Sequence, residues 1–289
     1  MRPLSGSLLL TFRELWAMRI TQGMFAIASL AWLLLSFALN MDIVEGSISA
    51  LKIFGFDAGA PMERVFDEAT GEWVQQATSI DQFVVGINQF VFGASYFLGT
   101  LLGLFATMPL IAGFLEQGRI DLLLSKPVSR LRLLFGHLLG VWLTVLVLSC
   151  YLVGGVWLSL SLKTGVWLPH VLQSIPVIVL MFAVMYSVVL TTSIISRTSG
   201  LGLVLAYGLI FFSAILSAHD QLIPVLAPTS AAIFKGFYHA LPNFIEVVMM
   251  QAQLVEGSDV TRIYPFISSL IFGVIIHGLG IYWFAKRDF

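Results

Sequence analysis

The chain has 289 residues, of which 58% are hydrophobic and 11% are charged, and its formal net charge is −1. Soluble domains usually carry about 25% charged residues, so this composition excludes an ordinary water-soluble protein. The near-neutral charge gives no indication of a nucleic-acid partner, and the single cysteine, Cys150, excludes an intramolecular disulfide.

Residues 1–19 form a polar segment that we expect to be an amphipathic cytoplasmic leader. The apolar run Ile20–Leu39 comes next. It has the roughly 20 residues that a helix needs to span the hydrocarbon core of a bilayer. Because no cleavage motif of the Ala-x-Ala type directly follows this apolar run, we expect an uncleaved first helix rather than a signal peptide.

Five later runs are also apolar and long enough to span the bilayer, and none of the six contains Asp, Glu, Lys or Arg. The sequence therefore predicts an all-α integral membrane protein with six transmembrane helices, which form a single membrane domain over residues 1–289. The five later runs are Val85–Phe114, Leu134–Leu160, Leu172–Ile195, Gly200–Leu216 and Pro265–Phe284.

The distribution of positive charge predicts the orientation of these helices. If the N-terminus is cytoplasmic, the inner segments hold ten of the 15 Lys and Arg residues and four of the 16 acids. The outer segments then hold the other five basic residues and 12 acids. Lys and Arg concentrate on the cytoplasmic side of membrane proteins, so we expect both termini in the cytoplasm.

Two outer segments are longer than simple connections. Residues 40–81 carry eight of the 12 acids of the outer segments and a turn signal at Asp67–Gly71, which suggests a small outward excursion with a hairpin. Residues 217–264 contain two apolar pieces, Leu222–Phe234 and Phe237–Val255, that are interrupted by prolines. Pieces of this length favour re-entrant or interfacial helices, and an ordinary surface loop is the alternative.

The inner connection between the second and third spans, residues 115–133, has the most distinctive sequence. Gly118 lets the chain turn as it leaves the membrane, and three consecutive leucines, Leu122–Leu124, need an apolar partner or the lipid surface. Pro127 suits the first turn of a helix. A helix from Pro127 to Leu160 is about 50 Å long at 1.5 Å per residue, so we expect it to project below the bilayer.

This inner connection resembles the signature of the ABC-2 type transporter permeases, and most closely their NosY-like branch, which is associated with multicopper-enzyme maturation. Three other segments agree with the family pattern, namely Thr11–Glu14, Leu241–Phe244 and Phe284–Phe289. Two positions depart from it, because Arg119 stands where Thr is common and His137 where Lys is frequent. The residues that carry the resemblance are Glu116, Gly118, Ile120, Asp121, Leu122, Leu123, Leu124, Ser125, Lys126, Pro127, Ser129 and Arg130.

The resemblance implies a permease subunit in the cell inner membrane that works with a separate cytoplasmic ATPase and a second permease copy. It also implies export and no catalysis by the chain itself. The sequence agrees, because a nucleotide-binding P-loop requires a Gly-Lys pair and none occurs in the chain. We therefore expect no cofactor on this subunit, with ATP and Mg²⁺ bound by its partner.

The resemblance further assigns the inner connection as a coupling helix that docks into the ATPase. Leu122, Leu123 and Leu124 are the expected buried anchors, and Arg119, Lys126 and Arg130 the charged rim. Contact with the lipid surface alone is the other interpretation of the leucines. The full set of expected coupling residues is Glu116, Gly118, Arg119, Asp121, Leu122, Leu123, Leu124, Ser125, Lys126, Pro127 and Arg130.

The main alternative function is an ATP-independent secondary transporter, which usually places ionisable groups within its spans. Here proton or sodium coupling would have to rest on His277 in the last span or on neutral dipoles. His277 could line a permeation route, or it could hydrogen-bond a neighbouring helix. The five histidines show no metal-ligand spacing, so no metal site is predicted.

Small residues recur at four-residue spacing on the second span, at Ser95, Gly99, Gly103 and Thr107. Small residues on one stripe let helices approach closely. The stripe is therefore either the face that meets a second permease copy or a surface for packing within the subunit.

Overall fold

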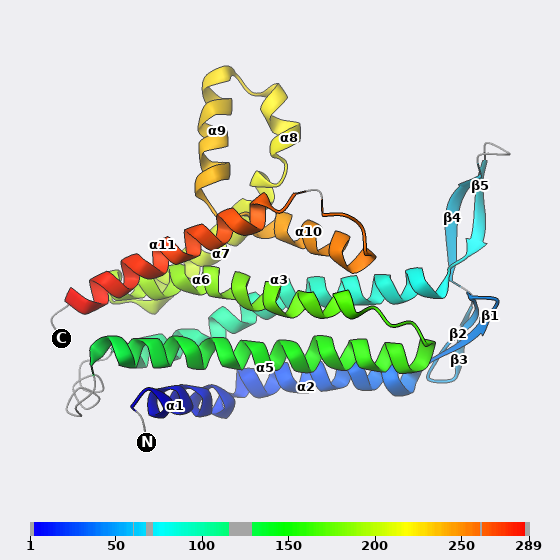
Figure 1. Ribbon diagram of the computed structural model, residues 1–289, viewed down its shortest axis with the longest axis horizontal. Helices are drawn as coiled ribbons and strands as arrows, with labels where there is room; N and C mark the ends of the chain where they lie inside the picture. Colours follow the sequence, from blue (N-terminus) through cyan, green and yellow to red (C-terminus); the bar gives the residue numbers. More distant parts are fainter. Residues whose placement is uncertain (1–2, 60, 68–71, 116–128, 261, 287–289) are drawn as a thin grey trace.

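The computed structural model describes residues 3–286 except 60, 68–71, 116–128 and 261. Within these residues, six helices are long and apolar enough to cross a membrane, which confirms the predicted six-span, all-α fold. They run side by side as one bundle (Figure 1). They are α2 (Arg19–Leu33) with its continuation η1 (Leu34–Ala38), α3 (Ile80–Leu115), α5 (Arg130–Thr164), α6 (Ser174–Ser196), α7 (Ser199–Leu216) and α11 (Tyr264–Lys286).

The second and third spanning helices are much longer than a bilayer requires. Helix α3 has 36 residues and α5 has 35, which makes each more than 50 Å long by rough estimate at 1.5 Å per residue. The start that we expected for α5 at Pro127 is wrong, because Ser129 is extended, with ψ of 142°, and the helix begins at Arg130. Serine is a common residue at the position directly before the first turn of a helix.

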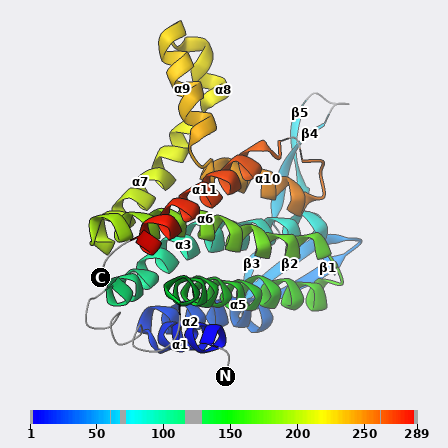
Figure 2. The same ribbon diagram turned by 60° about the vertical axis from the view of Figure 1, so that its left-hand side comes forward.

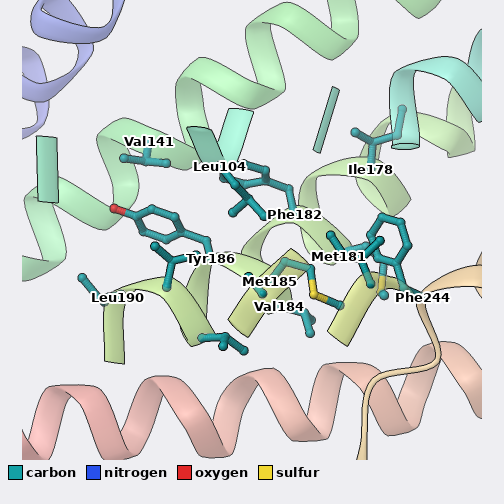
Figure 3. Close-up of a cluster of buried hydrophobic side chains, with 14 of the residues drawn as sticks. Leu104, Val141, Ile178, Met181, Phe182, Val184, Met185, Tyr186, Leu190 and Phe244 are labelled. Atoms are coloured by element: carbon teal, nitrogen blue, oxygen red, sulfur yellow. The ribbon is translucent and has the colours of Figure 1, made fainter. Parts of the chain in front are cut away.

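Helix α6 forms the centre of the bundle, between α3, α5, α7 and α11 (Figure 2). Most of its side chains are buried, and Figure 3 shows Phe182 and Tyr186 of α6 in one apolar cluster with Leu104 of α3 and Val141 of α5. Helix α11 approaches α6 closely, because a Cβ added at Gly280 would lie 2.4 Å from Thr191 Oγ1. The same Thr191 hydroxyl donates a hydrogen bond to the carbonyl oxygen of Ile276 on α11, at 2.8 Å.

The predicted leader forms helix α1 (Pro3–Ala17), which lies along α5 at the end of the bundle that holds both termini (Figure 1). Thr11 and Leu15 are its buried residues in this contact, at 4% and 2% exposure. A Cβ added at Gly140 of α5 would lie 2.7 Å from the Thr11 Cβ. Helix α1 therefore packs directly on the α5 backbone.

The opposite end of the bundle carries the strands (Figure 1). An antiparallel sheet has the order β1-β2-β3, and β4 pairs with β5 as the hairpin expected from the turn signal. The amino group of Lys163 near the end of α5 donates to the carbonyl oxygen of Leu39, which fixes the first strand on the bundle. The strands are β1 (Leu39–Val44), β2 (Ser47–Ile53), β3 (Phe56–Gly59), β4 (Met62–Asp67) and β5 (Glu72–Ala77).

Residues 217–264 contain short helices rather than an ordinary loop. Helices α8 and α9 project from the bundle across its long axis, whereas α10 lies against α3 and α7 (Figure 1). Phe244, at the start of α10, is fully buried. The expected location of these short helices at the bilayer interface stays a prediction. The short elements are η2 (Pro169–Gln173), which precedes α6, α8 (His219–Leu222), η3 (Ile223–Val225), α9 (Pro228–Ala240) and α10 (Phe244–Glu256).

Candidate functional site

Most of the expected coupling residues lie outside the described part of the chain. Arg130 is described as the first residue of α5. Two helices flank the segment: α3 ends at Leu115 and α5 begins at Arg130. The residues outside the described part are Glu116, Gly118, Arg119, Asp121, Leu122, Leu123, Leu124, Ser125, Lys126 and Pro127.

Both flanking helices are anchored in the protein interior close to this segment. Ile111 near the end of α3 and Leu134 near the start of α5 are fully buried. One turn further along α5, the imidazole Nε2 of His137 lies 2.7 Å from the phenolic oxygen of Tyr186 on α6. His137 and Tyr186 are 4% and 0% exposed. A buried polar contact therefore joins the first turns of α5 to α6.

The stripe of small residues on α3 faces the inside of the subunit. Ser95, Gly99 and Gly103 line a cavity between α2, α3, α5 and α6. A Cβ added at Gly103 would lie 2.9 Å from Phe182 Cε2, whereas one at Gly99 would meet no atom within 4 Å. The structure thus places the stripe in internal packing and around a cavity.

His277 lies on α11 beside Trp142 of α5, with ring centroids 5.6 Å apart and an edge-to-face angle of 82°. Its Nδ1 lies 3.0 Å from the carbonyl oxygen of Gly273, one turn earlier in the same helix. Nδ1 of His277 is therefore hydrogen-bonded within α11, and the contact of the His277 ring with α5 is aromatic.

A second polar group joins α8, α9 and α10, where the α8–α9 pair projects from the bundle (Figure 1). The buried carboxylate of Glu246 accepts a hydrogen bond from the Tyr238 hydroxyl at 2.8 Å, and its other oxygen lies 3.3 Å from Nδ1 of His219. The His219 ring stacks on Tyr238, with centroids 4.0 Å apart. His219 Nε2 lies 3.0 Å from Asp220, which also pairs with Arg262 at 2.7 Å. These contacts fasten the projecting α8–α9 pair to α10.

The electrostatics of this group follow from burial and from its carboxylates. Burial raises the pKa of Tyr238 above its usual range, and the hydrogen bond to Glu246 raises it further. The Tyr238 hydroxyl therefore stays protonated and can donate to the carboxylate. The hydrogen bond to Asp220 raises the pKa of the exposed Arg262, which keeps this guanidinium charged.

The comparison with protein families decides the identity. The family model described as "ABC-2 family transporter protein" matches residues 13–289. The chain belongs to the ABC-2 transporter family. The match includes all six spanning helices of this ABC-2 protein, whereas no curated protein matches it.

No group of three or more His, Cys, Asp or Glu side chains that could hold a metal ion occurs within the described part of the chain. Sequence reasoning missed the pairing of His137 with Tyr186 and the group around Glu246. Glu246 gave a signal, because it interrupts an otherwise apolar segment, but its partners lie on other helices and no spacing rule connects them.

Proposed function

We propose that this ABC-2 protein is the permease subunit of an exporter whose energy comes from a separate cytoplasmic ATPase. The family match over residues 13–289 carries the proposal. The sequence supports a separate ATPase subunit, because it lacks the Gly-Lys pair of a P-loop. The ATPase binds ATP and Mg²⁺, and this chain forms the path for a hydrophobic or amphipathic substrate.

The coupling step places the ATPase at residues 116–128, between α3 and α5. Leu122, Leu123 and Leu124 insert into an apolar groove of the ATPase, and nearby charges set the orientation. The anchored ends of both helices support this role, because well-packed interiors transmit displacement rather than absorb it. Movement of the segment shifts α5, and the contact between His137 and Tyr186 carries the shift to the central helix α6.

The complex contains two permease copies with both termini in the cytoplasm. The positive charge of the inner segments supports this orientation. Exposed apolar side chains on α7 and α11, such as Val204 and Val274, at 70% and 72% exposure, are available for lipid or for the second copy. Because the small-residue stripe of α3 faces the subunit interior, it is not part of this contact.

The test uses an affinity-tagged chain purified from its native membrane together with bound proteins. Leu123→Asp places a charge where the proposal requires an apolar anchor, so the P-loop ATPase and the ATP hydrolysis of the eluate should be lost. Val225→Asp is the matched control, because Val225 is 83% exposed in η3, which belongs to the connection between α7 and α11 rather than to the coupling segment. Normal co-purification and hydrolysis with Leu123→Asp, at equal membrane insertion, would contradict the coupling proposal.

A further inference from the structure

Helix α10 is fixed to the bundle, whereas the projecting helix α9 is held through a single buried side chain. The Tyr96 hydroxyl of α3 donates to the carbonyl oxygen of Phe244 at 2.8 Å, and Gln251 Nε2 donates to Ser174 Oγ of α6 at 2.7 Å. Within α9, every residue of which is described, Tyr238 alone is buried. An isolated helix as short as these 13 residues is only marginally stable. Helix α9 therefore depends on the contacts around Tyr238.

His219 lies at the centre of these contacts, and both nitrogens of its ring face carboxylates. Nε2 lies 3.0 Å from Asp220 Oδ1, and Nδ1 lies 3.3 Å from Glu246 Oε1. The contact at Nδ1 lacks the alignment of a hydrogen bond, so it depends on the charge of the ring. A neutral imidazole has one N–H donor and one acceptor nitrogen, whereas an imidazolium donates from both nitrogens. A neutral ring would turn an acceptor nitrogen toward one of the two carboxylates, so this geometry suits the protonated ring.

The charges of the group also balance only when His219 carries a proton. Asp220 pairs with Arg262 at 2.7 Å, and the second oxygen of Glu246 accepts from the neutral Tyr238 hydroxyl. Two cations then face two carboxylates. When the ring is neutral, one negative charge remains, although the Glu246 side chain is only 10% exposed. A buried carboxylate without a counter-charge is costly.

Few of the surrounding groups can change charge near neutral pH. Burial raises the pKa of Tyr238, and the hydrogen bond to Asp220 raises the pKa of Arg262, so the first stays neutral and the second stays charged. Histidine is the side chain that ordinarily changes charge between about pH 5 and 8. His239 is therefore the competing candidate for a pH response. The titratable or charged side chains that α9, α11 and the connection before α11 place around His219 and Tyr238 are Lys235, Tyr238, His239, Arg262 and Tyr264.

We propose that His219 is a proton-binding site that latches α8 and α9 onto α10. The imidazolium pairs with Asp220 and Glu246 and stacks on Tyr238, with ring centroids 4.0 Å apart, and a cation on an aromatic face is stabilised. The His219 side chain is 13% exposed, so the ring can exchange its proton with solvent. The contact with Glu246 holds while the ring is protonated and is lost as the pH rises. This latch adds to the proposed function and does not depend on the ATPase.

The test measures how firmly α9 is held at two pH values. The full chain in phosphatidylcholine nanodiscs, without any ATPase, is studied by amide hydrogen exchange at about pH 5.5 and about pH 8, which bracket the ordinary charge change of histidine. Rates are expressed as protection relative to free peptides, so that the intrinsic pH dependence of exchange cancels. We expect Pro228–Ala240 to be about five- to tenfold more protected at the lower pH, the size of one partly buried ion pair.

The central helix Ser174–Ser196 is the internal reference and should have the same protection at both pH values. Equal protection of α9 at the two pH values would overturn the proposal. A change of the same size in the central helix would also overturn it, because the response would then belong to the whole bundle.

Two histidine variants assign the proton to one ring. His219→Gln keeps a polar side chain that cannot become charged, so α9 should have the same protection at both pH values. His239→Gln is the matched control, since His239 lies on α9 itself and contacts Tyr264 rather than Glu246. This variant should respond to pH like the wild type. A response that persists in His219→Gln, or that disappears in His239→Gln, would overturn the proposal.

A second matched pair tests the carboxylate that receives the charge. Glu246→Gln removes the negative charge and keeps an acceptor for the Tyr238 hydroxyl, so the protection of α9 at low pH should fall toward the value at high pH. Glu256→Gln alters the same helix at an exposed carboxylate that accepts from Gln89 and should leave the pH response intact. An unchanged response in Glu246→Gln would exclude the pair of His219 and Glu246 as the latch.

Discussion

His137 on α5 and Tyr186 on α6 share a buried hydrogen bond of 2.7 Å, although 49 residues separate them in the sequence. His137 lies two turns after the start of α5, and Tyr186 lies in the centre of the bundle core. This contact connects the helix that follows the inner connection with the helix around which the other spans pack.

Tyr186→Phe should lower the thermal stability of the purified protein. The substitution keeps the ring and removes the hydroxyl that bonds to His137, so we expect a loss of about 1–3 kcal/mol in the free energy of unfolding. Thermal unfolding in detergent measures it. Tyr282→Phe is the control, since Tyr282 is 53% exposed. Equal stability of Tyr186→Phe and the wild type would show that the contact contributes nothing.

Gly140→Ala should loosen α1 from α5. The added methyl group would lie 2.7 Å from the Thr11 Cβ and 3.1 Å from the Leu8 carbonyl oxygen, and overpacking of this kind costs about 1–3 kcal/mol. We expect the backbone amide hydrogens of Pro3–Ala17 to exchange faster in this variant, which hydrogen-exchange mass spectrometry measures. Gly154→Ala on the same helix meets no atom within 4 Å, so it should be neutral or stabilising by up to about 1 kcal/mol. Equal exchange rates of α1 in Gly140→Ala and Gly154→Ala would contradict the close contact between α1 and Gly140.

The sequence predicted the spans because lipid imposes a simple requirement. A helix that crosses the core needs a long uncharged run, and the six runs satisfy it. The prediction was less accurate where polar residues are helical, as at Ile80–Gln82, because hydropathy does not detect a helix that continues beyond the lipid. The hairpin of β4 and β5 was predictable from a local turn signal.

The candidate sites depended on contacts that no local pattern encodes. Glu246 meets His219 and Tyr238 because α8, α9 and α10 fold back on one another. Spacing on α3 identified a stripe of small residues, but two uses of such a stripe were equally compatible with the sequence. The position of Phe182 against Gly103 places this part of the stripe in internal packing, which no spacing on α3 could have shown.

Tyr238→Phe should release the projecting α8–α9 pair from α10. At neutral pH the variant loses the hydrogen bond to the buried carboxylate of Glu246, so limited proteolysis within Pro228–Ala240 should accelerate. Because the Tyr238 pKa is raised by folding, the hydroxyl contributes stability below its ordinary pKa of about 10, and this is lost at higher pH.

The wild type should therefore lose stability above pH of about 10 more steeply than Tyr238→Phe. Thermal unfolding across this pH range measures the difference. Parallel curves for the two proteins, together with equal proteolysis at neutral pH, would show that Tyr238 does not hold α9.

The most direct test of the account asks on which side of the membrane the inner connection lies. Cys150→Ser removes the single native cysteine, and Ser125→Cys then provides one thiol for a membrane-impermeant maleimide. Val225→Cys in the same background reports the outer side. The account predicts that Ser125→Cys is modified only after the cells are opened, while Val225→Cys is modified in intact cells. Modification of Ser125→Cys in intact cells would contradict docking of a cytoplasmic ATPase at this segment.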